Sequence, residues 1–359
     1  MLDFSNPDRF RQLVGGQTHG LTAALLRTGL GVAEVPYSLV VSVRNLLYDY
    51  GVFRTRRLGI PILSVGNLTL GGTGKTPMVA WLCRFFLDSG RRPGIISRGY
   101  GKTVDGVNDE FLEIASRFPD VSHRQNPNRV AAAEEFLRHR DADVLILDDA
   151  FQHRRIVRDF DVVLLDALEP FGFEHVFPRG TLRESITSLR RAHSVLLSRA
   201  DGISETERHR IRDRVLRLAP HVVWGEVAHV PCSLVSLSGQ EHDVSKLRDR
   251  RVLAFCGIGN PNAFRQTLER NGAEIVELVS FPDHHRFTSS ELHSLHATAA
   301  KLRVDGTVCT MKDLVKIDGS DAFGDLPLHG VAVRMQFLSG ETEFCERLQG
   351  KIGGAMKAI

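Results

Sequence analysis

Residues 67–77 read Asn-Leu-Thr-Leu-Gly-Gly-Thr-Gly-Lys-Thr-Pro (NLTLGGTGKTP), and the rest of the chain is best understood from this glycine-rich stretch. The preceding residues 58–66 (LGIPILSVG) are an apolar run typical of a buried strand, and residues 78–90 (MVAWLCRFFLDSG) have helical character. A strand, a loop carrying Gly-Lys-Thr and a helix together constitute a P-loop. Its glycines let backbone N–H groups turn onto phosphate oxygens, and the N-terminus of the following helix adds partial positive charge. The stretch therefore predicts a P-loop NTPase-like α/β fold.

Within this loop, Lys75 and Thr76 carry the side-chain chemistry. A P-loop lysine reaches the β- and γ-phosphates, and the hydroxyl that follows it ligates Mg²⁺. The strict pattern has glycine six residues before the lysine, where this chain has Thr69, so we interpret the loop as a variant. The residues expected to bind the nucleotide are Thr69, Leu70, Gly71, Gly72, Thr73, Gly74, Lys75 and Thr76.

A second acidic element occurs later in the chain. Residues 143–149 (DVLILDD) form an apolar run that ends in Asp148 and Asp149. Acids at the carboxyl end of a central parallel strand lie at the crevice where α/β sheets bind ligands, so we expect both to face Mg²⁺. Further apolar runs alternate with helical stretches, which predicts a mostly parallel sheet between helices. These runs are 94–97, 161–166 and 194–198.

The pattern changes near residue 225, where a second, smaller α/β lobe is predicted to begin. Two apolar runs alternate there with two helical stretches, in the order 251–256, 262–272, 274–281 and 289–304. Ser289 or Ser290 is a candidate N-cap of the last helix. The expected domains are an N-terminal amphipathic segment, a P-loop core and a second lobe that closes the active-site cleft, with bounds 1–57, 58–225 and 226–359.

Residues 21–53 of the N-terminal segment are apolar but interrupted by Arg27, Glu34, Pro36 and Arg44. A spanning helix wants roughly 20 apolar residues in a row, so none is predicted here. We expect one or two helices with an apolar face and arginines at their ends. Two interpretations stay open: the segment lies in the headgroup layer on anionic lipid, or it packs on the body as an ordinary amphipathic element.

Composition and charge exclude several classes of protein. A length of 359 residues predicts about two domains at roughly 100–200 residues each. Five scattered cysteines without a CxxC pair argue against a zinc knuckle and fit a reducing compartment. The net charge is +3, and residues 1–57, with seven arginines and four acids, account for all of it. The body therefore has no basic field, and nucleic acid is not an expected partner.

Seven motifs follow one another in a specific order. They are GNLTLGGTGKTP (66–77), SRGYG (97–101), NDE (108–110), LDDAFQHRR (147–155), RGTLRE (179–184), GIGNP (257–261) and FPDHHRF (281–287), with MKD at 311–313. Together they closely resemble the tetraacyldisaccharide 4'-kinase family of the lipid A pathway. The resemblance covers nearly the whole chain, and several motifs in one order are far more specific than a P-loop alone.

The resemblance implies a kinase that uses ATP and Mg²⁺ and phosphorylates the 4'-hydroxyl of a tetraacylated disaccharide lipid. It implies peripheral binding at the cytoplasmic face of the inner membrane and no particular protein partner. By motif, Asp109 resembles the family's catalytic aspartate, and His284 resembles its partner. The other matched residues are Asp148, Asp149 and Glu184 for the metal, Tyr100 for the nucleotide, and Glu110, Gln152, His153 and Arg183 as substrate or supporting groups.

Two positions depart from the family pattern, because this chain has Asn108 and Ala150 where the family has glycine. Asparagine tolerates a left-handed backbone better than most residues, so Asn108 is a mild change. Ala150 would be strained if the backbone there required a positive φ. The ionisable groups remain, so the departures concern loop geometry more than chemistry.

The acceptor hydroxyl loses a proton as it attacks, so a carboxylate within hydrogen-bond reach is required, and Asp109 is the predicted base. A histidine bonded to that carboxylate would orient it or share the proton. His284 lies 175 positions later, with His285 as a neighbouring competitor. We therefore expect the pair to meet across a cleft between the lobes, with domain closure as a gate.

Two alternatives remain at this point. A P-loop GTPase or metal-insertion chaperone reads guanine with an Asn/Thr-Lys-x-Asp motif, which Ser198-Arg199-Ala200-Asp201 matches only in part. No His/Cys cluster that would deliver a metal is evident either. A non-catalytic membrane adaptor switched by nucleotide would leave Asp109 and the histidine motif without a task.

Overall fold

The computed structural model describes residues 7–99, 108–283, 285–317, 323 and 326–357. Its contacts divide the chain into two compact units, each discontinuous in sequence. The first unit comprises Met1–Arg98, Arg124–Ala228 and Gln336–Ile359, and the second comprises Gly99–His123 and His229–Met335. The functional division into 1–57, 58–225 and 226–359 stays a prediction, because compactness alone assigns no function to a segment.

The first unit is built on a parallel sheet with the strand order β7, β6, β5, β1, β4 and β2. Every residue of β1, β2, β4 and β6 is buried, as expected for parallel strands that are covered on both faces. This confirms the predicted mostly parallel sheet. The strands are β1 (Ile62–Asn67), β2 (Pro93–Ser97), β3 (His123–Gln125), β4 (Val144–Asp148), β5 (Phe160–Asp166), β6 (Ser194–Ser198) and the first part of β7 (Val223–Ser236).

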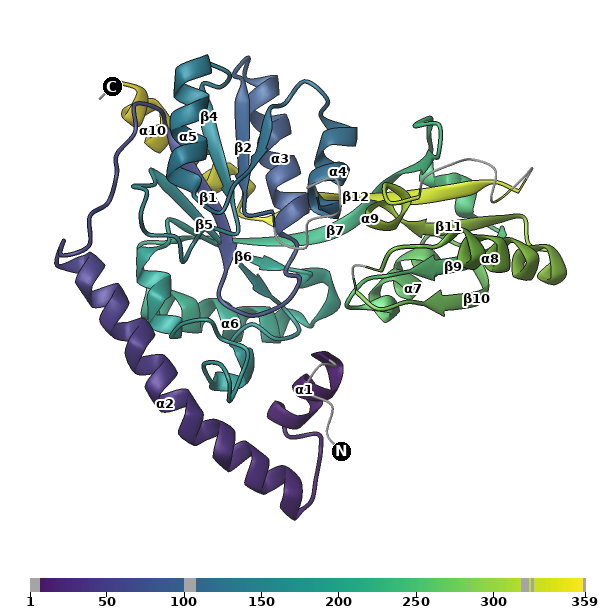
Figure 1. Ribbon diagram of the computed structural model, residues 1–359, viewed down its shortest axis with the longest axis horizontal. Coiled ribbons are helices and arrows are strands. Elements are labelled where there is room, and N and C mark those ends of the chain that lie inside the picture. The colour runs from purple at the N-terminus through teal and green to yellow at the C-terminus, as the bar shows by residue number, and fades with distance from the viewer. Residues whose placement is uncertain (1–6, 100–107, 284, 318–322, 324–325, 358–359) are drawn as a thin grey trace. The chain divides into compact units, whose positions relative to one another are not determined.

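Helices α3, α5, α6 and α10 of the first unit lie along this sheet, whereas α1 and α2 do not (Figure 1). Phe136 packs with Ile62 and Leu145 in one hydrophobic cluster, whereas Val215 packs with Val163 in another. The helices are α1 (Pro7–Val14), α2 (Leu21–Asp49), α3 (Lys75–Asp88), α5 (Arg129–His139), α6 (Glu205–Leu218) and α10 (Glu341–Lys357), with short 3₁₀ turns η1 (Gly172–Glu174), η2 (Ile186–Arg191) and η3 (Ala200–Gly202).

The second unit is a smaller α/β lobe, and it includes residues 99–123, which the sequence analysis assigned to the P-loop core. Its strands run in the order β10, β9, β11, β12 and β7, with parallel pairing of β9 with β10 and β11 and of β11 with β12, while β8 pairs with β7 antiparallel. Leu253 and Phe255 pack on Leu292 and Leu295 of α8. The elements are α4 (Asp109–Arg117), β8 (Glu241–His242), η4 (Val244–Leu247), β9 (Arg251–Cys256), α7 (Pro261–Arg270), β10 (Glu274–Ser280), α8 (Ser289–Leu302), β11 (Gly306–Thr310), α9 (Met311–Leu314) and β12 (Leu328–Ser339).

Two element boundaries differ from the expectation. Strand β1 begins at Ile62 rather than near residue 58, because Pro61 has no N–H for a sheet hydrogen bond. Helix α8 is capped by Thr288 rather than by Ser289 or Ser290. The Thr288 hydroxyl accepts from Glu291 N at 3.2 Å, and the Glu291 carboxylate accepts from Thr288 N at 2.8 Å. This reciprocal capping box fixes the helix start one residue earlier than expected.

The N-terminal segment contains one long helix, α2, drawn in purple in Figure 1. It continues through Pro36 over 29 residues, and by length and composition it is apolar enough to cross a membrane. The expected one or two helices are thus a single helix, and the expectation that it does not span a membrane stays a prediction. Arg27 and Arg44 lie inside this helix rather than at the ends of shorter ones, because the chain stays helical past both.

Helix α2 turns polar side chains towards the rest of the first unit and apolar ones away from it. Arg27 donates to Thr18 O at 2.8 Å, and Glu34 accepts from Val176 N at 2.7 Å. On the opposite side, aliphatic residues recur every three to four positions, which places them on one helix face. They form the apolar stripe of α2: Leu21, Leu25, Val32, Val35, Leu39, Val43 and Leu46, all exposed, with Leu25, Val32 and Leu39 at 64%, 70% and 62%.

Candidate active site

The P-loop joins β1 to α3 at the carboxyl edge of the parallel sheet. Gly71 and Gly74 have φ values of 113° and 87°, a left-handed backbone that glycine adopts without the steric cost of a Cβ. Asn67, at the end of β1, supports the turn by donating from Nδ2 to Thr69 O at 2.8 Å. Helix α3 begins at Lys75, directly after Gly74, so its first-turn N–H groups face the loop. The strand, loop and helix expected from the sequence are all present.

A neighbouring segment runs alongside the loop and supports it. Leu70 N donates to Thr181 O at 2.7 Å, and Arg183 N donates to Leu68 O at 2.7 Å. Thr69, which stands where the strict pattern has glycine, is buried and forms an antiparallel bridge with this segment. The variant position is therefore part of a two-stranded contact that fixes the loop from outside.

Asp149 and two cations form the charged centre of this site. Asp149 Oδ1 accepts from Arg183 Nη1 at 2.8 Å and lies 3.7 Å from Lys75 Nζ. Burial by itself would raise the pKa of Asp149, but the charges of Lys75 and Arg183 outweigh it and hold the pKa below its ordinary value. Asp148, the last residue of β4, is buried beside it. The structure thus places Asp149 beside Lys75 of the P-loop, as the sequence predicted for the strand end, and adds Arg183 to this pair.

The two departures from the glycine pattern are accommodated without strain at their own positions. Asp149, not Ala150, takes the left-handed backbone, with a φ of 48°, and aspartate is enriched there among non-glycine residues. Asn108 has a φ of −111° and caps α4, its side chain accepting from Phe111 N at 2.9 Å. Neither substitution therefore disturbs the local turn.

The donor set around the loop fits a magnesium ion shared with phosphate. Within the described part of the chain, no group of three or more His, Cys, Asp and Glu side chains could hold a metal alone. Mg²⁺ characteristically uses one or two carboxylates and completes its shell with water and substrate phosphate. Buried Thr76 on α3, with Asp148 and Asp149 at the end of β4, supplies this kind of oxygen set.

Glu184 lies in a buried hydrogen-bond network. Its two carboxylate oxygens accept from Asn45 Nδ2 at 2.8 Å, Gln152 Nε2 at 3.1 Å and Arg191 Nη2 at 2.9 Å. Gln152 Nε2 also donates to Asn67 O at 2.9 Å, where the P-loop begins. The network connects α2 to the loop, while the assignment of Glu184 to the metal stays a prediction.

His153 follows Gln152 and is neutral at physiological pH. Burial, reinforced by nearby arginines that include Arg129 and Arg158, lowers the pKa of His153 to about 4. Among the described residues its Nε2 has no hydrogen-bond partner. A neutral, buried imidazole suits a supporting role better than proton transfer near pH 7.

Arg199, in the partial guanine motif, is engaged with the loop instead. Its Nη2 donates to Gly72 O at 2.9 Å, and its guanidinium is ion-paired with Asp166. This use of the side chain, together with arginine in place of lysine, does not resemble base recognition.

Asp109 and Glu110 lie in the second unit, in the first turn of α4. Asp109 is buried, and its Oδ1 accepts from Glu110 N at 3.1 Å. Glu110 Oε1 lies 3.5 Å from Lys312 Nζ on α9. The expected catalytic aspartate thus belongs to an acidic helix start that faces a lysine far along the sequence.

Lys312 is a residue that the sequence analysis did not single out. Burial alone would lower its pKa, but the carboxylates of Glu110, Glu113, Asp109 and Asp283 raise the pKa well above that of an ordinary lysine. Burial raises the pKa of Glu113. The structure therefore brings the NDE motif and the start of the histidine motif into range of one ammonium group. The sequence feature that could have indicated Lys312 is the MKD tripeptide at 311–313. It follows an apolar run, as the two aspartates follow the run at 144–147.

Of the two neighbouring histidines of that motif, only His285 belongs to the described residues. His285 Nε2 lies 3.1 Å from Glu291 Oε1 and is stacked on Phe281. His284 and Tyr100 lie outside the described residues, so their predicted roles stay predictions.

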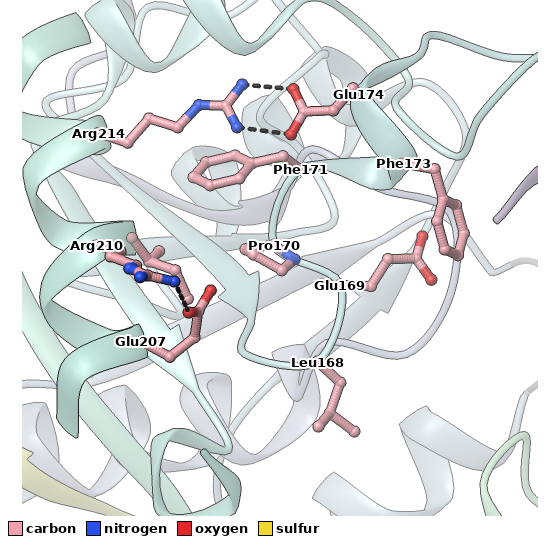
Figure 2. A pocket seen from close by; sticks show the side chains of 10 residues that line it. Leu168, Glu169, Pro170, Phe171, Phe173, Glu174, Glu207, Arg210 and Arg214 are labelled. Carbon is pink, nitrogen blue, oxygen red and sulfur yellow. Dashed lines mark hydrogen bonds and ion pairs between the residues drawn. The ribbon is translucent and has the colours of Figure 1, made fainter. Parts of the chain in front are cut away.

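The first unit also has an open pocket of about 350 Å³ beside α6 (Figure 2). Four of its charged side chains are paired with one another: Arg214 donates to Glu174 at 2.6 Å, and Arg210 lies 3.5 Å from Glu207. The Arg214 guanidinium also lies 4.1 Å from the centre of the Phe171 ring. Glu169 lines the same pocket. None of its lining residues belongs to the P-loop, so the loop remains the better candidate site.

Several known proteins are similar to this chain over most of its length. A family model described as tetraacyldisaccharide-1-P 4'-kinase matches residues 26–353. A tetraacyldisaccharide 4'-kinase of Syntrophus aciditrophicus (strain SB) is 40% identical over 87% of this chain and 88% of its own length. One from Anaeromyxobacter sp. (strain K) is 39% identical over 84% of both chains. A crystal structure of LpxK from Aquifex aeolicus in complex with ATP matches with a TM-score of 0.72 and 26% identity, over 91% of this chain and 99% of that one.

Proposed function

Because the chain belongs to the tetraacyldisaccharide-1-P 4'-kinase family, we propose that it transfers the γ-phosphoryl group of ATP to the 4'-hydroxyl of a tetraacylated disaccharide lipid. The observation that most supports this proposal is the P-loop with Lys75 paired to Asp149 at the end of β4. Binding of ATP by the Aquifex relative supports ATP as the donor.

In this proposal the first unit holds the triphosphate. Backbone N–H groups of the loop and the N-terminus of α3 bind the phosphate oxygens. Lys75 and Arg183, both paired with Asp149, offer two positive charges to the β- and γ-phosphates. Thr76 and the acids at the end of β4 would hold Mg²⁺, which would neutralise further charge on the triphosphate.

The second unit supplies the proton acceptor. Asp109 takes the proton of the 4'-hydroxyl as its oxygen attacks the γ-phosphorus. Lys312 holds the acidic start of α4 in place through Glu110, and His284 is the proposed partner of Asp109. Phosphoryl transfer is mostly positioning and charge neutralisation, so these few groups suffice.

The apolar stripe of α2 supports binding of the enzyme to the membrane that contains its lipid substrate. The free energy falls when a face of exposed aliphatic side chains moves from water into the boundary between headgroups and acyl chains of a bilayer. We propose that α2 lies on the membrane rather than spanning it, because Glu34 and Asn45 on its other face are hydrogen-bonded within the first unit. Because ATP is the proposed phosphoryl donor, we propose that this surface lies on the cytoplasmic side of the membrane.

The test is a phosphoryl-transfer assay with the purified full chain, [γ-³²P]ATP, Mg²⁺ and tetraacyldisaccharide 1-phosphate in mixed micelles. We expect a labelled lipid whose mass has increased by one phosphate. The same lipid already phosphorylated at the 4' position is the control acceptor and should remain unlabelled. Label on that control, or equal turnover of nucleotide with no lipid present, would contradict the proposal and favour a nucleotide switch.

A further inference from the structure

Helix α1 places an arginine directly against the phosphate-binding loop. Arg11 Nη2 lies 3.5 Å from Leu70 O. A Cβ built on Gly71 would overlap Arg11 Nη2 and lie 3.6 Å from its Cζ. The guanidinium therefore lies against the loop at Gly71, although Arg11 precedes Gly71 by 60 residues in the sequence.

The position of Arg11 is defined by packing and not by its own contact alone. Leu13 and Val14, which follow it on α1, are buried. Arg179 Nη1 donates to Val14 O at 2.9 Å, and Arg27 Nη1 donates to Leu13 O at 3.3 Å. Two arginines therefore anchor the C-terminal end of this helix, and Arg11 projects from an anchored element.

Glu169 orients the guanidinium. Its Oε2 lies 3.7 Å from Arg11 Nε, and its other oxygen accepts a short hydrogen bond from the Thr181 hydroxyl. Thr181 O in turn accepts from Leu70 N. Glu169 therefore holds the Nε side of Arg11 while the Nη2 side faces the loop, and both are tied to the same backbone segment.

The contact of Arg11 with the loop is weak as a hydrogen bond, since 3.5 Å is at the long limit for N–H···O. Lys75 and Arg183, by contrast, are paired with Asp149, and Arg199 is paired with Asp166. A guanidinium oriented by a carboxylate but only loosely held by a carbonyl has capacity for a stronger anionic partner at the loop.

We propose that Arg11 is an arginine finger supplied in cis: in the complex with ATP and acceptor, its guanidinium contacts the oxygens of the γ-phosphoryl group. The inference rests on the proposed function and deepens it. As the bond from the 4'-oxygen to the γ-phosphorus forms, the bond from that phosphorus to the β–γ bridging oxygen breaks. The electron pair of the broken bond stays on ADP, and the hydroxyl proton passes to Asp109. Arg11 neutralises the charge spread over the oxygens during this transfer.

Arg11 lies before residue 26, where the match to the family model begins. The finger is therefore a contribution of the segment that precedes the matched region. Its connection through Arg27 to α2 also places it next to the helix proposed to lie on the membrane.

The experiment compares wild type, Arg11→Ala, Arg11→Lys and Arg9→Ala, an exposed arginine on the same helix, as the charge-matched control. We expect Arg11→Ala to lower kcat at least ~100-fold with the KM for ATP changed less than ~3-fold. Arg11→Lys should recover little, because an ammonium lacks the planar fork. Arg9→Ala should stay within ~3-fold of wild type. Circular dichroism melting excludes a folding defect.

A second readout is independent of turnover. Arg11→Ala should weaken binding of ADP with aluminium fluoride, which mimics the transferring phosphoryl group, while binding of ADP alone is unchanged. Unchanged kcat and unchanged binding of aluminium fluoride in Arg11→Ala would overturn the proposal and show that Arg11 takes no part in the reaction. Tighter ATP binding with faster turnover would also overturn it and show that Arg11 obstructs the site. Either result leaves the proposed kinase function intact. An inactive wild-type protein would instead contradict the kinase function, without bearing on the contact between Arg11 and the loop.

Discussion

Asp149 Oδ1 lies 2.8 Å from Arg183 Nη1 and 3.7 Å from Lys75 Nζ, so one carboxylate oxygen holds two cations at the phosphate-binding loop. The sharing fixes the ammonium and the guanidinium where a triphosphate would meet them, and it makes the charge of Asp149 essential to the arrangement.

Asp149→Asn should lower the melting temperature at pH 7 and lower kcat by about 100-fold, the scale for losing one preorganised electrostatic contact. Because the pKa of Asp149 is held below the ordinary value of 3.8, the stability contributed by its charge is present above that value and is lost as pH falls through the folded-state pKa. Melting of both proteins between pH 2.5 and 7 checks this. A difference that stays constant down to the lowest pH would show that charge is not its origin.

Asp109→Ala should lower turnover by at least ~100-fold while ATP still binds, the usual scale for loss of a general base. The measurement is kcat together with the Kd for ATP from calorimetry. Glu277→Ala, an exposed acid on β10 of the same unit, is the matched control and should leave both values unchanged. Near-normal turnover in Asp109→Ala would remove this residue from the mechanism.

Lys312→Met should destabilise the second unit, because three carboxylates of α4 would lose their common cation. We expect a loss of about 1–3 kcal/mol, less than for a wholly buried pair because 30% of the Lys312 side chain is exposed. The raised pKa of Lys312 means that its contribution is fully present below the ordinary lysine value of 10.5 and disappears only as pH rises through the folded-state pKa. Denaturant unfolding at pH 7, with Lys301→Met on α8 as control, provides the check. Equal stability of the two variants would refute the role.

Replacing Leu25, Val32 and Leu39 together by glutamine should weaken association with anionic vesicles by at least ~10-fold, because three exposed aliphatic side chains no longer enter the bilayer. Flotation measures the bound fraction. The control replaces Leu168 and Leu338, which are exposed and are not part of α2, by glutamine. This control should float as wild type does. Equal flotation of wild type and the triple variant would contradict the membrane-binding role of α2.

The elements that could be predicted from the sequence are those specified by local pattern. The apolar run 251–256 is β9 and the run 194–198 is β6, because a short aliphatic run between turn residues has few alternatives to a buried strand. The phosphate-binding loop followed in the same way from its glycines and the flanking strand and helix.

The features that could not be predicted depend on contacts between distant residues. Segment 99–123 belongs to the second unit through bonds such as Arg117 Nη1 to Val333 O at 2.9 Å, which no local pattern encodes. Lys312 gains its significance only because α9 packs beside α4. The sequence also could not predict which face of α2 contacts the rest of the first unit. Periodicity defines an apolar and a polar side of a helix, but not which of them packs against the protein.

The orientation of α2 also has a practical consequence for handling the protein. In water without surfactant, copies of the chain would bury their aliphatic ridges against one another, so the apparent mass should rise with concentration. Added detergent would compete for the same ridge and return the particle to a single copy. The colloidal behaviour of the purified enzyme is thus governed by one helix, and the amount of detergent needed for a monodisperse sample reports how much of that ridge is uncovered.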